Sequence, residues 1–458
     1  MKKTKILSIA ALALMMTACS NDVDLNTPQS ANDSKGIPFT ATVATDRDAA
    51  TRALSYTESE NKLEFVWLVG EKMALVYTVG GQSYNSTATV TAVDAETGAA
   101  TISATLNDGV DNGTKLTIIY PETAADGTTG NIKSGLLAEQ DGMLNNPEGV
   151  FLDVRKGTGI VSVAGGQAYL GSSTKLKAQY AICKFSLGII LDAEHPLYIR
   201  DGKNAMITTV KPASSANQLF VAMAPATDKV FAFKATNATN RIRKKGNAAL
   251  KAGKFYQTEL PALYPMPMAD VEDEDVGCII ANDAKVYMTP ATAKSAGKTP
   301  EAMIAFVGSV ECNNGIALAL RDCDAGGSYG AGTYYWSRAG NFEEEGKPIP
   351  HWRKNHPIEG GEWRMPSKQD WQLMFLGCRY ETDMIARADI MEPINGFKDK
   401  LKAAGASLST EYGEIYWISD GEGKYYVRFE NEGNYKAIFE NDGFYNTMPL
   451  YTRACLAF

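Results

Sequence analysis

Residues 63–77 read Leu63-Glu-Phe-Val-Trp-Leu-Val-Gly-Glu-Lys-Met-Ala-Leu-Val-Tyr77, two apolar runs on either side of Gly70-Glu71-Lys72. Apolar β-branched and aromatic residues around a short polar turn predict a strand, a turn and a second strand. Further short apolar runs follow at residues 88–93, 100–106 and 116–120, and Asp, Asn and Gly residues separate them. Short strands at regular spacing are typical of β-sandwiches, so this part of the chain is predicted to be all-β.

The β pattern extends from Ile37 to about Pro261, which is long enough for two sandwiches of ~100 residues each. Within the second block, alternation over residues 178–187 places Cys183, Phe185 and Leu187 on one face of a strand. Cys183 is therefore expected to be a buried core thiol. We assign the first sandwich to residues 37–160 and the second to residues 161–262.

The composition excludes several classes of function. The chain has 458 residues, of which 45% are hydrophobic and 21% charged, as expected of a folded protein with about three domains. A net charge of −8 leaves no basic surplus to neutralise phosphates, so no nucleic-acid partner is expected. With only 3 His residues, no His-Glu-x-x-His motif and no phosphate-binding loop, we expect no enzyme, no cofactor and no metal site.

The N-terminus has the pattern of a signal peptide. A basic start precedes the apolar residues 6–16, which as a helix would span about 16 Å, well short of the ~30 Å core of a bilayer. The run ends in Met16-Thr17-Ala18-Cys19, which resembles a bacterial lipobox. That resemblance implies cleavage after residue 18 and acylation of Cys19, for example with palmitate. An ordinary signal peptide with an incidental Cys is the alternative. Residues 19–36 are polar and are expected to form a flexible tether.

The order of these features resembles the fimbrillin-like lipoproteins of Bacteroidota, which are subunits of type V pili. The matching motifs are the lipobox, Trp67 before Gly70-Glu71-Lys72-Met73-Ala74, Ile119-Tyr120-Pro121, Ala181-Ile-Cys-Lys-Phe185 and Leu250-Lys-Ala-Gly-Lys-Phe-Tyr256. The resemblance covers residues 1 to about 260. It implies two tandem transthyretin-like β-sandwiches, a lipid-anchored precursor at the cell outer membrane, and other fimbrial subunits as partners.

The same resemblance implies assembly by donor-strand exchange. An Arg-specific protease would remove the first strand, and a neighbouring subunit would supply a strand in its place. In this sequence the expected first strand alternates Ile37, Phe39, Ala41 and Val43 on one face. The polar segment that follows contains Arg47 and Arg52 as candidate cleavage sites, and Arg52 within Thr-Arg-Ala is closest to the family pattern. The alternative is a solvated loop whose arginines have no special role.

Prolines and acidic residues separate the β-rich half from the rest of the chain. Pro261, Pro265 and Pro267 lead into Asp270-Val-Glu-Asp-Glu-Asp275. Residues 263–275 are therefore expected to form an extended, exposed linker. Five clustered acids are a weaker match to a Ca²⁺ site, because no Gly-punctuated loop spaces their oxygens.

Residues 276–458 form a different kind of domain, with five of the six Trp residues and five of the seven Cys residues of the chain. Ser367-Lys-Gln-Asp370 predicts a capping box at the start of a helix whose buried face includes Trp371 and Phe375. A second helix is expected over 393–404, and a hairpin over 414–429. These elements indicate an α+β fold. Five cysteines permit at most two disulfides, and export from the cell would allow them.

Three segments of this region resemble the C-type-lectin-like domains of surface proteins from the same phylum: Glu362-Trp-Arg-Met-Pro-Ser-Lys-Gln-Asp-Trp371, Tyr416-Trp-Ile-Ser419 and Arg453-Ala-Cys-Leu-Ala-Phe458. The Ca²⁺-binding motifs of true C-type lectins are incomplete here, so no metal is implied. The aromatic residues Tyr334, Tyr335, Trp336 and Trp352 are candidates to contact a glycan or protein receptor, and packing inside the domain is the alternative for each.

The sequence thus predicts a fimbrial subunit, at the tip or in an accessory position, that is exported as a lipoprotein and assembled by proteolysis-triggered strand exchange. The alternative is a monomeric surface lipoprotein that binds glycan or protein through its C-terminal domain and never polymerises.

Overall fold

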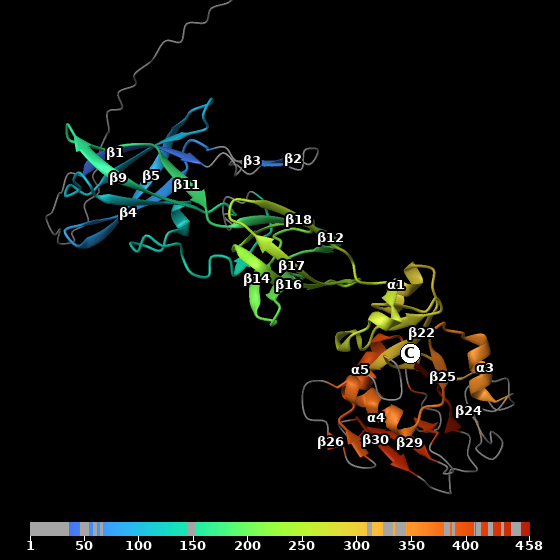
Figure 1. Ribbon diagram of the computed structural model, residues 1–458. Helices are drawn as coiled ribbons and strands as arrows, with labels where there is room; N and C mark the ends of the chain where they lie inside the picture. Colours follow the sequence, from blue (N-terminus) through green and yellow to red (C-terminus); the bar gives the residue numbers. More distant parts are fainter. Residues whose placement is uncertain are drawn as a thin grey trace, which may run out of the picture.

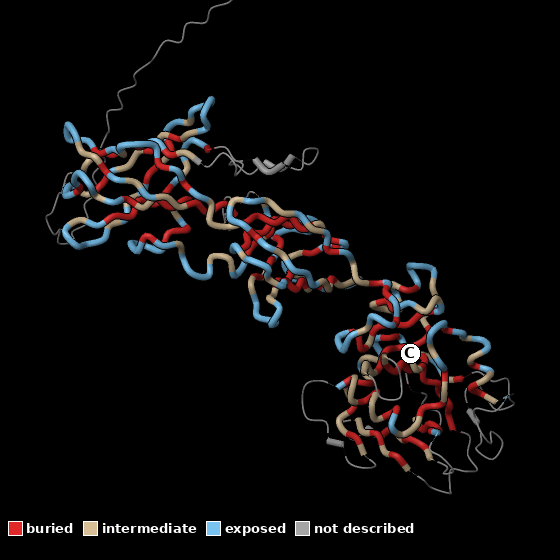
Figure 2. Tube along the Cα trace, in the orientation of Figure 1, coloured by how far each residue is buried: buried red, intermediate tan, exposed pale blue. Residues whose placement is uncertain are grey.

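The computed structural model describes residues 36–45, 55–57, 62–64, 67–144, 152–308, 314–323, 333–334, 345, 347–379, 385–386, 390–406, 408, 414–419, 425–431, 435–440 and 450–458. These residues form three successive bodies along the chain (Figure 1), each with its own buried interior (Figure 2). The first two bodies are built from strands, which confirms the all-β prediction for the N-terminal half.

The first body, here called the N-terminal barrel, is one eight-stranded sheet in the order β10-β1-β11-β9-β7-β4-β5-β6. Its strands are β1 (Ile37–Thr45), β4 (Lys72–Val79), β5 (Gln82–Val93), β6 (Ala100–Leu106), β7 (Lys115–Tyr120), β9 (Arg155–Ala164), β10 (Gln167–Leu170) and β11 (Thr174–Ala178). Strand β1 also pairs with β6, so the sheet closes on itself rather than forming two separate layers. A short hairpin of β2 (Ser55–Thr57) and β3 (Lys62–Glu64) and a 3₁₀ turn η1 (Glu122–Ala124) accompany it.

The second body, here called the second sandwich, packs a three-stranded sheet against a five-stranded one. The first sheet has the order β15-β12-β18, with β12 (Ala181–Leu191), β15 (Ala216–Met223) and β18 (Phe255–Leu260). The second has the order β17-β16-β13-β14-β8, with β8 (Glu139–Gln140), β13 (Leu197–Asp201), β14 (Met206–Val210), β16 (Ala226–Thr236) and β17 (Arg241–Leu250). Phe185 and Phe233 meet across the interface with ring centroids 5.2 Å apart. Cys183 is buried as predicted, and burial raises the pKa of its thiol to about 12.

The chain passes between these two bodies more than once. After β7 it leaves the barrel and contributes β8 to the second sandwich, where Glu139 and Gln140 lie beside β14. It then returns to the barrel for β9, β10 and β11. The boundary placed between residues 160 and 161 therefore falls inside β9, because local alternation does not show which sheet a strand joins.

The C-terminal body, residues 264–458, is α+β. One seven-stranded sheet has the order β19-β21-β20-β22-β23-β32-β25, and a second has the order β24-β31-β28-β29-β30-β27-β26. Their bounds are β19 (Met266–Pro267), β20 (Ile279–Ala281), β21 (Lys285–Tyr287), β22 (Pro300–Val307), β23 (Gly315–Ala319), β24 (Thr333–Tyr334), β25 (Glu362–Arg364), β26 (Ile385–Ala386), β27 (Ile390–Glu392), β28 (Ile415–Trp417), β29 (Tyr426–Asn431), β30 (Tyr435–Glu440), β31 (Leu450–Tyr451) and β32 (Cys455–Ala457). The helices are α1 (Pro290–Ser295), α3 (Pro348–Asn355), α4 (Lys368–Gly377) and α5 (Asn395–Ala403).

Helix α4 begins at the predicted capping box. The backbone N–H of Asp370 donates to Ser367 Oγ at 3.1 Å, and the backbone N–H of Ser367 donates to Asp370 Oδ2 at 2.8 Å. Trp371 and Phe375 are buried on the inner face of the helix, and Phe397 of α5 packs edge-on against Phe375 at 5.0 Å. The prediction of two helices and of the β28–β29 pair is confirmed.

Residues 263–275 are not the exposed linker that the sequence predicts. Tyr264, Met266 and Met268 are buried in the core of the C-terminal body, and the side chain of Asp275 is completely buried. The segment contains β19 and two 3₁₀ turns, η2 (Met268–Asp270) and η3 (Asp273–Asp275). Asp270, Glu272, Asp273 and Glu274 are exposed, as the prediction expects of an acidic run. The prediction is wrong for the buried residues, and Asp275 can be buried because Arg241 and Arg243 of the second sandwich neutralise its charge.

Among the described residues, no helix combines the length and the apolar character needed to cross a membrane. Cys19 and the rest of the predicted signal peptide and tether lie outside the described residues.

Candidate functional site

The candidate site is strand β1 together with the strands on either side of it. On one side β1 runs antiparallel to β6, in register from Ile37 opposite Leu106 to Val43 opposite Ala100. On the other side it runs parallel to two short strands, with Phe39 opposite Ala168 of β10 and Val43 opposite Thr174 of β11. Strands β10 and β11 in turn pair with β9. Strand β1 therefore joins the two ends of the sheet and closes the barrel.

The side chains of β1 alternate between the barrel interior and the surface. Phe39, Ala41 and Val43 are 1%, 6% and 0% exposed. Ile37 is partly buried and packs against the same core. Burying a large apolar side chain stabilises a fold by about 1.5–3 kcal/mol, so Phe39 and Val43 alone hold β1 firmly in an intact barrel.

Strand β1 ends at Thr45, and the next residue in the described barrel core is Trp67. Arg47 and Arg52, the candidate cleavage sites, fall between these two points and outside the described residues. Trp67 is buried and packs edge-on against Tyr120 with ring centroids 5.2 Å apart. The next two residues, Leu68 and Val69, are 50% and 66% exposed. Among the described residues of the expected strand over 63–69, strand is present in Lys62–Glu64 and absent from 67–69, where Trp67 turns into the core and the next two residues face solvent.

A carboxyl group with an altered pKa lies where the chain re-enters the barrel. Glu71 Oε2 accepts a hydrogen bond from the backbone N–H of Leu68 at 3.0 Å. Burial raises the pKa of Glu71 to about 7, the Leu68 hydrogen bond opposes this rise, and the nearby Asp153 carboxylate adds to it. The charge of Glu71 therefore changes near neutral pH. Sequence patterns gave no indication of it, because its burial depends on non-local packing.

The aromatic candidates for receptor binding are not gathered at one surface by the described part of the chain. Trp352, on α3, is only 1% exposed and packs edge-on against Trp363 with centroids 5.7 Å apart. Its ring also lies 4.0 Å from that of His356. The prediction of a ligand-binding role for Trp352 is therefore wrong, because α3 directs this side chain into the core. Tyr334 lies in β24, and its side chain, Tyr335 and Trp336 lie outside the described residues.

The acidic run at residues 270–275 is used for ion pairing. Asp275 and Glu274 pair with Arg243, whose side chain comes from β17 of the second sandwich. In the part of the chain that the structure describes, no group of three or more His, Cys, Asp or Glu residues is arranged to hold a metal ion. In the sequence, the only sign of this pairing is the two arginines of Arg241-Ile-Arg243, which lie on one face of a strand. Their acidic partners lie about 30 residues further along the chain, so local patterns do not connect them.

Comparison with known proteins gives only distant structural similarity. No model of a protein family matches the chain, and no curated protein matches it. Among solved structures, a fimbrial protein from Bacteroides ovatus aligns with 93% of this chain and 100% of its own length, at 12% identity and a TM-score of 0.27. A fimbrial assembly protein from Parabacteroides distasonis aligns with 49% of this chain and 90% of its own length, at 10% identity and a TM-score of 0.28.

Proposed function

We propose that this protein is a pilus subunit of the fimbrillin type, in which β1 is cut from the chain and replaced by a strand from a neighbouring subunit. The observation that supports this most directly is the position of β1. It is the first barrel strand among the described residues, and it pairs on both sides. A single cut between Thr45 and Trp67 would separate β1 from the rest of the barrel, which lies wholly after the cut.

The vacated position would suit an incoming strand. Loss of β1 would leave the backbone groups of β6 unpaired on one side and those of β10 and β11 unpaired on the other. It would also expose the interior surface that Phe39 and Val43 cover. An extended segment with alternating apolar residues would restore both the hydrogen bonds and the apolar contacts.

Removal of β1 without a replacement is costly, because it exposes apolar core and unpaired edges together. We therefore expect β1 to remain bound after the cut until another strand displaces it. Cleavage after Arg52, or after Arg47, would make that displacement irreversible, since the released strand is no longer tethered.

The position of β32 supports a tip or accessory place in the pilus. Strand β32 lies between β23 and β25, and Cys455 and Leu456 are completely buried. Giving this strand to another subunit would break its pairing with β23 and would detach β25, which joins the sheet through β32. The chain is thus suited to accept a strand, and not to donate β32.

The remaining parts of the proposal rest on the sequence resemblances. Acylated Cys19 would anchor the precursor at the outer membrane, and an Arg-specific protease would process it at the cell surface. The C-terminal body, which resembles C-type-lectin-like domains, would bind a glycan or protein receptor, and other fimbrial subunits would be the partners of the barrel.

The test is strand exchange in solution. Purified precursor is treated with an Arg-specific protease, its new N-terminus is sequenced, and a fluorescent peptide of residues 36–45 is added. We expect a new N-terminus at residue 53 or 48 and incorporation of the peptide only after cleavage. A matched peptide carrying Phe39→Asp should not be incorporated, because it would place a carboxylate in the core.

Two results would overturn the proposal. One is a cleaved protein that never takes up the peptide. The other is a precursor with both Arg47→Ala and Arg52→Ala that exchanges strands as fast as the processed wild type. A processed protein that stays monomeric with every pilus subunit tested would favour the alternative, a monomeric surface lipoprotein that binds its ligand through the C-terminal body.

A further inference from the structure

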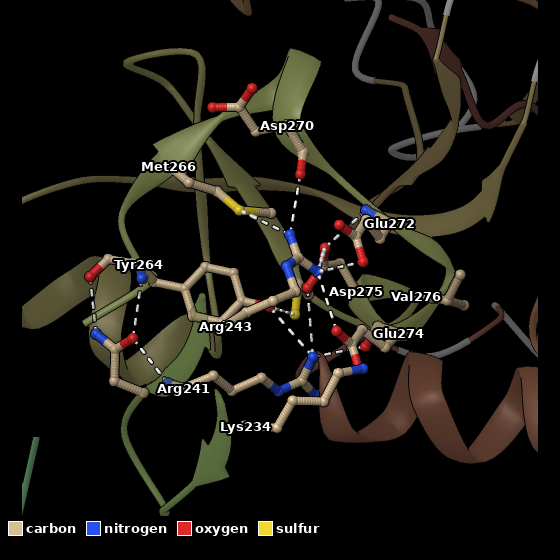
Figure 3. A network of polar contacts seen from close by, with 12 residues as sticks. Lys234, Arg241, Arg243, Tyr264, Met266, Asp270, Glu272, Glu274, Asp275 and Val276 are labelled. Atoms are coloured by element: carbon tan, nitrogen blue, oxygen red, sulfur yellow. Dashed lines mark hydrogen bonds and ion pairs between the residues drawn. The ribbon is translucent and has the colours of Figure 1, made fainter. Parts of the chain in front are cut away.

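The second sandwich and the C-terminal body meet at a network of polar contacts that the sequence did not predict (Figure 3). Its cations come from β16 and β17 of the second sandwich: Lys234, Arg241 and Arg243. Its anions come from the start of the C-terminal body: Glu272, Glu274 and Asp275. The network therefore spans the junction between the two bodies.

Asp275 is the centre of the network. Its side chain is 0% exposed, and both of its carboxylate oxygens have partners. Arg243 Nη1 lies 2.8 Å from Oδ2, and Arg241 Nη1 lies 3.3 Å from Oδ1. The hydroxyl of Tyr264 also donates to Oδ1. The backbone N–H of Glu272 donates to Oδ2 at 2.8 Å as well. A buried carboxylate is stable only when its charge is paired, and the two arginines supply the positive charge that Asp275 needs.

The two arginines also hold the backbone of the C-terminal body. Arg243 Nη2 donates to the carbonyl of Asp270 at 2.9 Å, and Arg241 Nη1 donates to the carbonyl of Glu274 at 2.5 Å. Each guanidinium therefore contacts a carbonyl and a carboxylate, which fixes its orientation as well as its position. Burial opposes the charge of Arg243, yet the Asp275 carboxylate raises its pKa above the ordinary value.

The chain segment between the bodies is itself fixed by hydrogen bonds. Asn240 Nδ2 donates to the carbonyl of Tyr264 at 2.7 Å, and the backbone N–H of Tyr264 donates to Asn240 Oδ1 at 2.9 Å. The backbone N–H of Leu263 donates to the carbonyl of Arg241 at 2.7 Å. Tyr264 is buried in the core of the C-terminal body, so these bonds join that core directly to the turn before β17.

We infer that the second sandwich and the C-terminal body form one rigid unit, locked by the Arg241–Arg243–Asp275 contacts, and do not move as separate domains on a linker. The inference holds whether or not strand exchange occurs. Its consequence is that the C-terminal body keeps a fixed direction relative to the strands that precede it.

The test compares full-length wild type with Arg243→Met and with Lys234→Met. Methionine keeps the aliphatic length of either side chain and removes its charge. Lys234 and its partner Glu274 are both about two-fifths exposed, so Lys234→Met is the matched control for a surface ion pair. Asp275→Asn, which keeps the shape of the side chain, tests the same lock from the other body.

Hydrogen exchange and small-angle X-ray scattering supply the readouts. For Arg243→Met and Asp275→Asn we expect exchange of the amides of residues 264–276 to accelerate about tenfold or more, and the distribution of interatomic distances to broaden. Lys234→Met should resemble the wild type in both measurements. The near-ultraviolet circular dichroism of the C-terminal tryptophans should remain unchanged, which separates unlocking of the junction from unfolding of the body.

The inference would be overturned if Arg243→Met and Asp275→Asn, both folded by circular dichroism, gave the exchange rates and scattering of the wild type. It would also be overturned if the wild type itself showed the broad distance distribution of two independently moving bodies.

Discussion

Phe39 provides the most direct test of how far the barrel depends on β1. Its side chain is 1% exposed, and its register partners on the two neighbouring strands, Ala104 of β6 and Ala168 of β10, are both small. Replacement by alanine would place three alanines side by side, and none of them could fill the space that the ring leaves. Truncation of a buried Phe costs about 3–5 kcal/mol, and we expect Phe39→Ala to lie within that range. Thr42→Ala, at an exposed position of the same strand, should change stability by no more than about 0.5 kcal/mol.

Hydrogen exchange during urea titration is the suitable assay, because five of the six tryptophans lie in residues 276–458 and would dominate fluorescence. Protection of β4 and β6 reports on the barrel, and protection of β12 reports on the second sandwich. With a urea dependence of about 1–3 kcal/mol/M, the expected loss lowers the barrel midpoint by roughly 1–5 M, a range that depends on the size of the cooperative unit. The reasoning would be refuted if Phe39→Ala shifted the barrel no further than Thr42→Ala. An equal fall in the urea midpoint measured from β12 would show that the two bodies unfold together.

Three further predictions concern single positions. Burial raises the pKa of Glu71 to about 7 in the folded protein, against 4.5 for the ordinary group, so the stability gained from its protonation is complete below pH 4.5 and is lost as the pH rises through 7. Between pH 5 and 8 the melting temperature of the wild type should therefore fall relative to that of Glu71→Gln. Parallel curves of melting temperature against pH would contradict this. Gly377→Ala would normally favour a helix, but here the new Cβ would clash with the carbonyl oxygen of Ala305. Chemical denaturation should therefore show a loss of stability, and a gain would mean that α4 can shift on β22. Trp352→Phe should lower the stability of the C-terminal body and leave any binding on a glycan array unchanged, whereas selective loss of binding by the folded variant would restore Trp352 as a ligand residue.

Features of the fold that depend on neighbouring residues could be predicted from the sequence. The capping box of Ser367 and Asp370, the buried face of α4 and the buried thiol of Cys183 each follow from spacing within one element. A helix has a period of 3.6 residues and a strand a period of 2, so these patterns identify the inner face before the partner is known.

Features that depend on pairing between distant segments could not be predicted in this way. Alternation in β1 showed which side chains face inward, but not that the strand pairs on both sides and closes the barrel. The acidic run ending in Asp275 had the composition of a solvated linker, and its first four acidic residues are indeed exposed. Only the ion pairs with Arg241 and Arg243 explain why Asp275 itself is buried. The ligand-binding prediction for Trp352 was wrong for the same reason, because the residues next to a Trp do not show whether its side chain faces solvent or the core.

The path of the chain between the first two bodies restricts how such a protein can change by recombination. Because β8 belongs to the second sandwich while β9, β10 and β11 belong to the barrel, neither body is encoded by one uninterrupted stretch of sequence. A genetic crossover between them would supply one body with strands from a different parent. The C-terminal body, in contrast, is a continuous segment that begins at Tyr264. A single crossover near Leu260 could replace the entire C-terminal body, provided that the new segment carried an acidic residue placed to form ion pairs with Arg241 and Arg243. Diversity among such proteins should therefore accumulate by replacement of the C-terminal body, while the barrel and the second sandwich are inherited together.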